Sequence, residues 1–278
     1  MLGFKPGNGR DARLPPKLVS FPSLLSPCPV LLFKRIFKFE KAKVEQLEKR
    51  LNLRYVPGPD FPLRATLHYG GRDFSAKILN MSGNGVGLLV KEKPDLTAGH
   101  HLRTDLQLDR HHLELKARIA HVEARDGGFA LGLGFVFEEF ELQKTYMQLL
   151  QPVVIGQSLQ PMAIDRVVQD DPQFFKSVFV GESDSLLTIR LALSPVDPLH
   201  SFELRMLDYF CRGSMDDGTG QSYALESRDA TEDPTGQPIF EASGGTHDEI
   251  RQLFRWILPN ISPAVPEDFR AFLQRFAG

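Results

Sequence analysis

Residues 78–89 read ILNMSGNGVGLL and combine small polar side chains with three glycines, at Gly83, Gly85 and Gly87. Glycine-rich loops after strands often bind phosphates, because the backbone can approach a ligand where no Cβ intervenes. The dinucleotide fingerprint G-x-G-x-x-G does not fit, since its third glycine position is Leu88 and a strand-like sequence follows where a helix is required. A P-loop does not fit either, because the loop has no Gly-Lys-Ser or Gly-Lys-Thr triplet. Both of these enzyme classes are therefore excluded.

A second set of polar residues uses the same loop differently. Asn80, Ser82 and Gly85 form the pattern N-x-S-x-x-G, and Arg50 and Arg54 form R-x-x-x-R upstream, with 25 residues between Arg54 and Asn80. Each pattern alone is weak evidence, because cations often end exposed helices and Asn and Ser often form turns. Together they combine planar cations, an amide and a hydroxyl, which is the chemistry of a nucleotide site.

The elements that would position these residues are mainly short strands. Alternation of apolar and polar residues predicts strands over 63–69 and 73–80, joined at Gly70-Gly71 as a tight hairpin. Further strands are predicted over these ranges: 85–90, 101–109, 113–124 and 127–137. Six short antiparallel strands at regular spacing indicate a small barrel. Helical periodicity predicts one helix of three or four turns before the barrel, within residues 34–53, and one that closes the barrel, over 139–150.

The rest of the chain suggests a second unit. We expect residues 1–35 to be a flexible or docking arm, 36–150 to contain the first helix and barrel, 151–172 to be a connector, and 173–278 to form an α+β domain. Strand-like pieces in that last domain precede helices over 248–258, with Thr246 as N-cap, and 267–276. Trp256 in the first of these helices is expected in a core or domain interface. No motif in this half indicates chemistry, so an enzyme hidden there has no support.

The barrel with these two motifs resembles the PilZ domain, which binds cyclic dimeric GMP. The resemblance covers residues 48–150 and includes the last strand, ALGLGFVF, and the helix after it. It implies a small six-stranded antiparallel barrel with flanking helices. With the α+β domain expected from the later residues, the chain would be mainly β, or α+β overall. It implies no resident cofactor and no catalysis.

The residue types agree with such a ligand, which carries two guanines and two phosphates. Arginine can donate a fork of hydrogen bonds to guanine O6 and N7, pair with phosphate, and stack on a purine. The resemblance assigns guanine and phosphate contacts to Arg50 and Arg54, and loop contacts to Asn80, Ser82 and Gly85. Gly85 is expected to allow a sharp turn and close approach of the backbone to the ligand.

Two positions depart from the common family pattern. Asn80 stands where aspartate is frequent, and Asn84 stands where glycine is frequent; asparagine tolerates positive φ, so the turn should survive. Lys49 adds a positive charge beside Arg50, and we take it as an additional ligand contact that would let the site bind a stacked ligand dimer. One ligand per chain in both native protein and the Lys49→Ala variant would contradict this hypothesis.

Other reactive side chains do not form recognisable sites. The histidines at 100–101, 111–112 and 121 lack acidic or cysteine partners at metal-ligand spacing, and Cys28 and Cys211 are too few for a disulfide framework. We therefore expect no metal. The alternative to a receptor is a scaffold that uses the barrel for protein contacts alone, which would not need the two arginines with Asn80 and Ser82.

The net charge and the N-terminal sequence indicate which partners and which compartment to expect. A net charge of −2 over 278 residues argues against binding of nucleic acid polymers. Residues 17–33 are apolar and follow basic residues, as in a signal peptide, but Pro22, Pro27 and Pro29 break the required helix and no membrane-spanning run occurs. We expect a cytoplasmic protein that, on binding cyclic dimeric GMP, regulates a partner protein in bacterial motility, biofilm or exopolysaccharide control.

Overall fold

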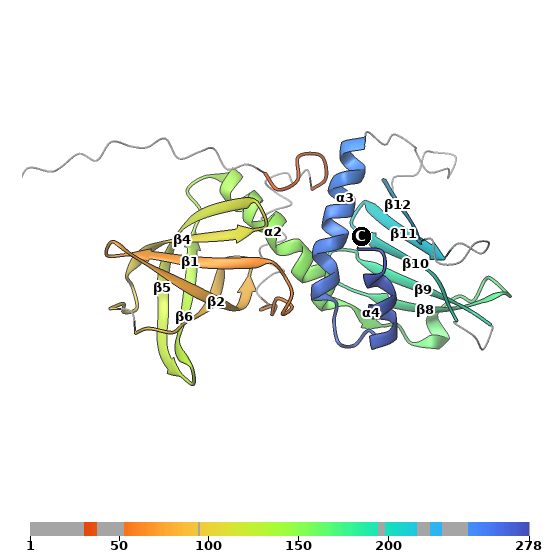
Figure 1. Cartoon of the computed structure of the whole chain (residues 1–278), viewed down its shortest axis with the longest axis horizontal. Coiled ribbons are helices and arrows are strands. Elements are labelled where there is room, and N and C mark those ends of the chain that lie inside the picture. The colour runs from red at the N-terminus through yellow and green to blue at the C-terminus, as the bar shows by residue number, and fades with distance from the viewer. Residues whose placement is uncertain are drawn as a thin grey trace, which may run out of the picture.

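A computed structural model describes residues 31–37, 53–93, 95–193, 198–215, 223–229 and 244–277. Two β units are joined by one long helix (Figure 1). The predicted six-stranded antiparallel barrel is confirmed, as is a second unit with its own sheet and helices. Two of the predicted ligand-binding residues, Lys49 and Arg50, lie outside the described residues.

The barrel closes in the strand order β1-β2-β3-β6-β5-β4. Its strands are β1 Leu63–Tyr69, β2 Arg72–Ser82, β3 Gly85–Val90, β4 His101–Leu108, β5 His111–Arg125 and β6 Gly128–Val136. Alternate leucines fill the interior, and Leu67, Leu88 and Leu106 are fully buried. The predicted hairpin at Gly70-Gly71 is present, with φ values of 58° and 75° that match the tight two-residue turn.

The helix after the barrel is longer than predicted. α2 runs over Phe140–Ser158 and includes Pro152, so the first part of the expected connector is helical. The end of this helix is buried at Val153, Val154 and Ile155, which compensates for the missing proline donor. A 3₁₀ turn, η1 Ile164–Arg166, and a short strand, β7 Gln160–Pro161, occupy the rest of the connector region.

The second unit is a six-stranded sheet in the order β12-β11-β10-β9-β8-β7. Its longer strands are β8 Phe174–Val180, β9 Leu186–Ala192, β10 Leu199–Met206, β11 Tyr209–Met215 and β12 Tyr223–Asp229. The helices α3 Gly244–Ile257 and α4 Glu267–Gln274 lie on one face of this sheet (Figure 1). Between them is the 3₁₀ turn η2 Leu258–Asn260. A cluster of phenylalanines joins sheet and helices, with Phe202 stacked on Phe254 at 5.4 Å between ring centroids.

One further local prediction was wrong: Thr246 is not an N-cap, because α3 already begins at Gly244. The helix expected within residues 34–53 lies mostly outside the described residues; residues 34–36 of that stretch form bends and Phe37 has a φ of 55°. In the second unit β10 and β11 form a hairpin that reverses at Leu207-Asp208. Trp256 is 3% exposed in the interface, as expected.

Candidate functional site

Asn80 and Ser82 reach the outer face of the barrel because β2 contains a bulge. Ile78 pairs with Leu88 and Asn80 with Gly87, so Leu79 is an extra residue in the strand. Without the bulge, alternation would place Asn80 on the inner face with Ile78. With it, Met81 is the buried residue, and Asn80 and Ser82 face outward on either side of it.

The loop after these residues is held by the helix that leaves the barrel. The hydroxyl of Tyr146 in α2 donates to the carbonyl of Ser82 at 2.7 Å and approaches the carbonyl of Gly85 at 3.0 Å. The backbone N–H of Phe135 donates to the carbonyl of Asn84 at 2.8 Å. Tyr146 is completely buried, and burial raises the pKa of its hydroxyl, which therefore stays a neutral donor. The loop is thus fixed before any ligand arrives.

The structure requires glycine at position 85 for a different reason from the one expected. Neither Gly85 nor Asn84 has a positive φ, so the turn does not depend on left-handed backbone. A Cβ on Gly85 would lie 2.2 Å from the carbonyl oxygen of Leu133 in β6. Glycine is required because two strands approach closely here. The hydroxyl of Ser82 meanwhile donates to Oδ1 of Asn84 at 3.2 Å across the turn.

Arg54 is placed beside these residues by a short backbone pairing. Tyr55 and Met81 exchange two hydrogen bonds of 2.8 Å in an antiparallel bridge. Both side chains are buried, so the neighbours on either side face outward. In this register Arg54 lies next to Ser82. Arg54 is exposed, and no described residue forms an ion pair with it. The structure therefore brings Arg54, Ser82, Asn80 and Gly85 to one edge of the barrel.

The segment that carries Arg54 also contacts the second unit. The N–H of Gly58 donates to Oδ1 of Asn260 at 2.8 Å, and the amide of Asn260 donates to the carbonyl of Trp256 at 2.8 Å. Asn260 is fully buried. A Cβ on Gly58 would overlap the carbonyl of Pro259, so the two backbones meet directly. Three residues lie between Arg54 and Gly58, and sequence reasoning did not anticipate this contact.

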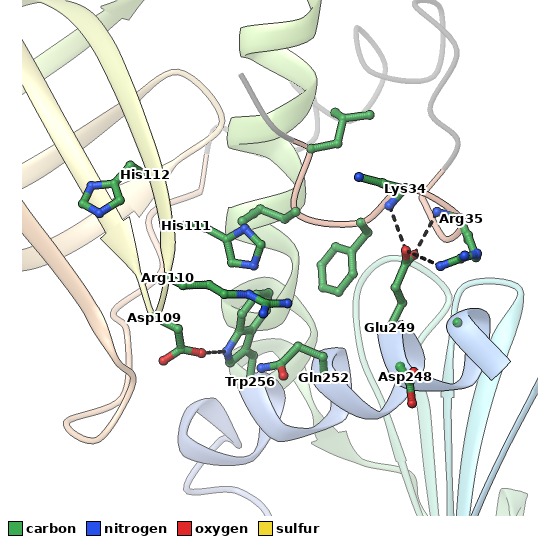
Figure 2. Close-up of a pocket in the computed structure, with 14 residues that line it drawn as sticks. Lys34, Arg35, Asp109, Arg110, His111, His112, Asp248, Glu249, Gln252 and Trp256 are labelled. Carbon is green, nitrogen blue, oxygen red and sulfur yellow. Dashed lines mark hydrogen bonds and ion pairs between the residues drawn. The ribbon is translucent and has the colours of Figure 1, made fainter. Parts of the chain in front are cut away.

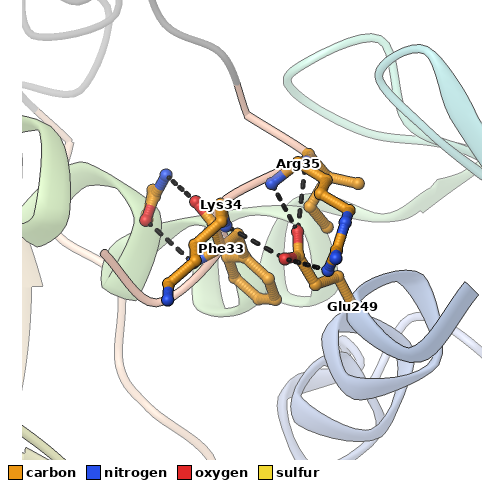
Figure 3. Close-up of polar contacts among 6 residues, drawn as sticks. Phe33, Lys34, Arg35 and Glu249 are labelled. Carbon is orange, nitrogen blue, oxygen red and sulfur yellow. Dashed lines mark hydrogen bonds and ion pairs between the residues drawn. The ribbon is translucent and has the colours of Figure 1, made fainter. Parts of the chain in front are cut away.

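A second contact fixes the chain that precedes the arginines. One carboxylate, Glu249 of α3, accepts hydrogen bonds from the backbone N–H groups of Lys34, Arg35 and Ile36, at 3.1, 2.8 and 3.0 Å (Figure 3). The side chain of Gln148 in α2 bonds both the N–H and the carbonyl of Phe33, which is buried. These residues of the predicted arm therefore dock, and they dock at the junction of the two units.

The junction contains a cavity of about 920 Å³. Figure 2 shows the turn of β4 and β5 on one side of it and α3 on the other. Two of the polar groups that line it have partners: the indole N–H of Trp256 donates to Asp109 at 2.7 Å, and Glu249 binds the arm. Burial, together with Arg110, lowers the pKa of His111, whose ring packs edge-on against Trp256. We interpret this cavity as a feature of the contact between the two units.

Two further findings concern the described residues. No group of three or more His, Cys, Asp or Glu is placed to bind a metal there. No helix among them is both long and apolar enough to cross a membrane.

The structure is a small closed antiparallel barrel in which four of the predicted site residues, Arg54, Asn80, Ser82 and Gly85, meet at the β2–β3 corner. Residues 48–154 match the model of the PilZ domain family, and this segment of the chain is a PilZ domain. No curated protein matches the chain.

Solved structures with related folds have low identity. The PilZ domain with c-di-GMP of YcgR from Escherichia coli is 13% identical, with a TM-score of 0.30, and covers 35% of this chain and 85% of that one. The Borreliella burgdorferi PlzA protein in complex with c-di-GMP is 11% identical, with a TM-score of 0.32, and covers 75% of this chain and 98% of that one. An uncharacterized Legionella protein is 20% identical, with a TM-score of 0.25, over 35% and 89% of the two chains.

Proposed function

We propose that this protein is a non-enzymatic, cytoplasmic receptor for cyclic dimeric GMP. The observation that carries the proposal is the placement of Arg54 beside Ser82 and Asn80 on an outer edge of a PilZ barrel. The guanidinium of Arg54 is exposed, and the amide of Asn80 makes no hydrogen bond within the described residues. Both groups are thus available to a ligand with guanine edges and phosphates.

The site has the parts that ligand binding requires. The carbonyls of Ser82 and Gly85 are held by Tyr146, so the loop face is preorganised and little ordering is needed there. Arg50, with Lys49 beside it, would close from the other side, as the family motif implies. In that arrangement the ligand lies between a fixed loop and the chain that leads into Arg54.

Binding would change the relation of the two units. A ligand that draws Arg54 towards the loop acts on a segment whose Gly58 is bonded to Asn260 of the second unit. The same ligand contacts the loop that α2 holds through Tyr146. A ligand shifts a conformational equilibrium by its difference in affinity for the two states, and these two contacts supply such a difference. The output would be a changed contact with a partner protein in motility, biofilm or exopolysaccharide control.

A scaffold without nucleotide is the second candidate, and one observation favours it. The described part of the second unit and its connector expose five large apolar side chains: Ile164, Val168, Phe175, Val180 and Leu193. Such residues could contact a partner whether or not a nucleotide binds.

Calorimetric titration of cyclic dimeric GMP separates the two candidates. We expect native protein to bind with a Kd of about 1 μM or below. Arg54→Ala should lose about 1.5–3 kcal/mol of binding free energy, because one set of charge-assisted hydrogen bonds is removed. Arg103→Ala is the matched control. Arg103 is an exposed arginine of the barrel on β4, away from the β2–β3 corner, and it forms an ion pair with Glu114 of β5. A folded native protein that shows no binding would refute the receptor proposal and leave the scaffold.

A further inference from the structure

A second bulge lies on the outer face of the barrel, in β5. Ile119 pairs with Leu133 and His121 with Gly132, so Ala120 is an extra residue. Up to Ile119 the alternate residues of this strand are buried; after the bulge His121 is exposed. The bulge therefore turns His121 outward, as the bulge in β2 turns Asn80 outward.

The strand register places these two bulged positions in one row across four strands. Asn80 of β2 pairs with Gly87 of β3, Gly87 pairs with Gly132 of β6, and Gly132 pairs with His121 of β5. A row with Asn80 at one end therefore has His121 at the other. Three strand spacings of about 4.8 Å put these ends about 14 Å apart.

The adjacent row repeats this arrangement with a cation at its end. Ser82 pairs with Gly85, Gly85 with Gly134, and Gly134 with Arg118 of β5. Arg118 is exposed, and no described carboxylate forms an ion pair with it. The rows are two residues apart, or about 7 Å along the strands. The outer face thus has a glycine floor two strands wide, with Asn80 and Ser82 along one side and His121 and Arg118 along the other.

Two glycines of this floor, Gly132 and Gly87, lie beneath polar side chains. The imidazole of His121 lies over Gly132, where an added Cβ would be 2.1 Å from Cε1 of the ring. The amide of Asn80 lies over Gly87 in the same way, with its atoms 2.9 Å from such a Cβ. A Cβ on Gly134 would meet no atom within 4 Å. Packing therefore does not require glycine at position 134, and the outer face is open there.

We propose that Arg118 and His121 form the far wall of the nucleotide site, and that the ligand spans the glycine floor between them and the Arg54 side. This inference rests on the proposed function and adds the β5 half of the site. Cyclic dimeric GMP has two guanines and two phosphates, so a site with an arginine at each side suits its two halves. Arg118 donates hydrogen bonds from its guanidinium group to the half of the ligand that lies farther from Arg54. The imidazole ring of His121, which lies over Gly132, contacts the base of that half.

The test is calorimetry of the full chain with cyclic dimeric GMP. Arg118→Ala should raise the Kd about tenfold to a hundredfold, and Arg118→Lys less, because it keeps the charge and loses the fork. His121→Ala should raise it about threefold to tenfold. Gly134→Leu projects a side chain from the floor into open space, so it should weaken binding strongly with an unchanged melting temperature. The control Arg125→Ala removes a charge at the other end of β5, beside Gly128, and should stay within about twofold of native.

The results distinguish this inference from the proposed function. If native protein binds, Arg54→Ala weakens binding, and both Arg118→Ala and Gly134→Leu bind as native protein does, the far wall is refuted and the receptor stands. If Gly134→Leu alone weakens binding, the ligand occupies the floor and the role of Arg118 is refuted. If native protein does not bind, both proposals fail together.

Discussion

The two sides of the β2–β3 corner differ in how they are held. On the loop side, the carbonyls of Ser82, Asn84 and Gly85 all accept hydrogen bonds from groups of the barrel or of α2. On the arginine side, one bridge at Tyr55 and one bond at Gly58 position Arg54. The first side belongs to the barrel, and the second is shared with the C-terminal unit. A rigid face paired with a face attached to another unit is suited to transmitting a binding event.

This difference separates stability from affinity. Substitutions on the loop side should alter folding first, because its contacts are internal and buried. Substitutions on the arginine side should alter binding or the coupling of the units and leave the barrel intact. The following predictions test that separation from the largest expected effect to the smallest.

Gly85→Ala should be the most damaging change. Its Cβ would lie 2.2 Å from the carbonyl oxygen of Leu133, which is backbone and cannot rotate away. We expect the free energy of unfolding to fall by about 2 kcal/mol or more, as for overpacking elsewhere. Gly134 is the matched control because it pairs with Gly85 in the ladder and has open space at its Cβ position.

Urea denaturation of the two variants measures this effect. Gly134→Ala should remain within about 1 kcal/mol of native protein, since alanine also reduces the entropy of the unfolded chain. Equal stability of the two variants would show that the close approach of β3 and β6 is not what requires Gly85.

Tyr146→Phe should have a smaller effect on stability. It removes the hydroxyl that serves two carbonyls of the loop, and it leaves the ring contacts with Phe135 and Phe137 in place. We expect the free energy of unfolding to fall by about 1–3 kcal/mol, because buried acceptors lose their donor. Binding should weaken less than in Arg54→Ala, since the ligand contacts themselves remain.

The same substitution at another barrel tyrosine is the control for that experiment. Tyr69 places its hydroxyl 3.4 Å from Nδ1 of His100, in an exposed contact. Tyr69→Phe should therefore change unfolding in urea by no more than about 0.5 kcal/mol. If Tyr146→Phe is equally harmless, the loop is not held through α2.

Much of the barrel could be predicted from sequence, because its strands alternate regularly and its turns use glycine pairs. The proposed site was harder to predict because Asn80 in β2 and His121 in β5 both follow bulges. Strict alternation puts Asn80 on the same face as Ile78, and His121 on the same face as Ile119. Only the register, with Leu79 and Ala120 unpaired, shows that Asn80 and His121 face outward. The motif identified Asn80, but nothing local identified His121.

The contacts between the units could not be predicted for a similar reason. Gly58 and Asn260 are separated by 202 residues, and no periodic pattern indicates that they meet. The same is true of Trp256 and Asp109, although an interface position was expected for Trp256. The helix α2 was predicted over 139–150 but continues through Pro152 to Ser158. Burial of the surrounding residues outweighs that local signal.

The smallest predicted effect concerns the arm that leads to the arginines. Glu249→Gln should lower the free energy of unfolding by about 1 kcal/mol, because three backbone donors lose a charged acceptor and meet an amide. Hydrogen exchange at residues 34–36 should become faster in this variant. Arg35→Ala is the control that removes the ion pair with Glu249, which is 3.6 Å long and has an arginine 52% exposed. Exposed pairs contribute little, so this control should exchange as native protein does. Faster exchange in Arg35→Ala but not in Glu249→Gln would show that the ion pair, rather than the backbone contacts, holds the arm on α3.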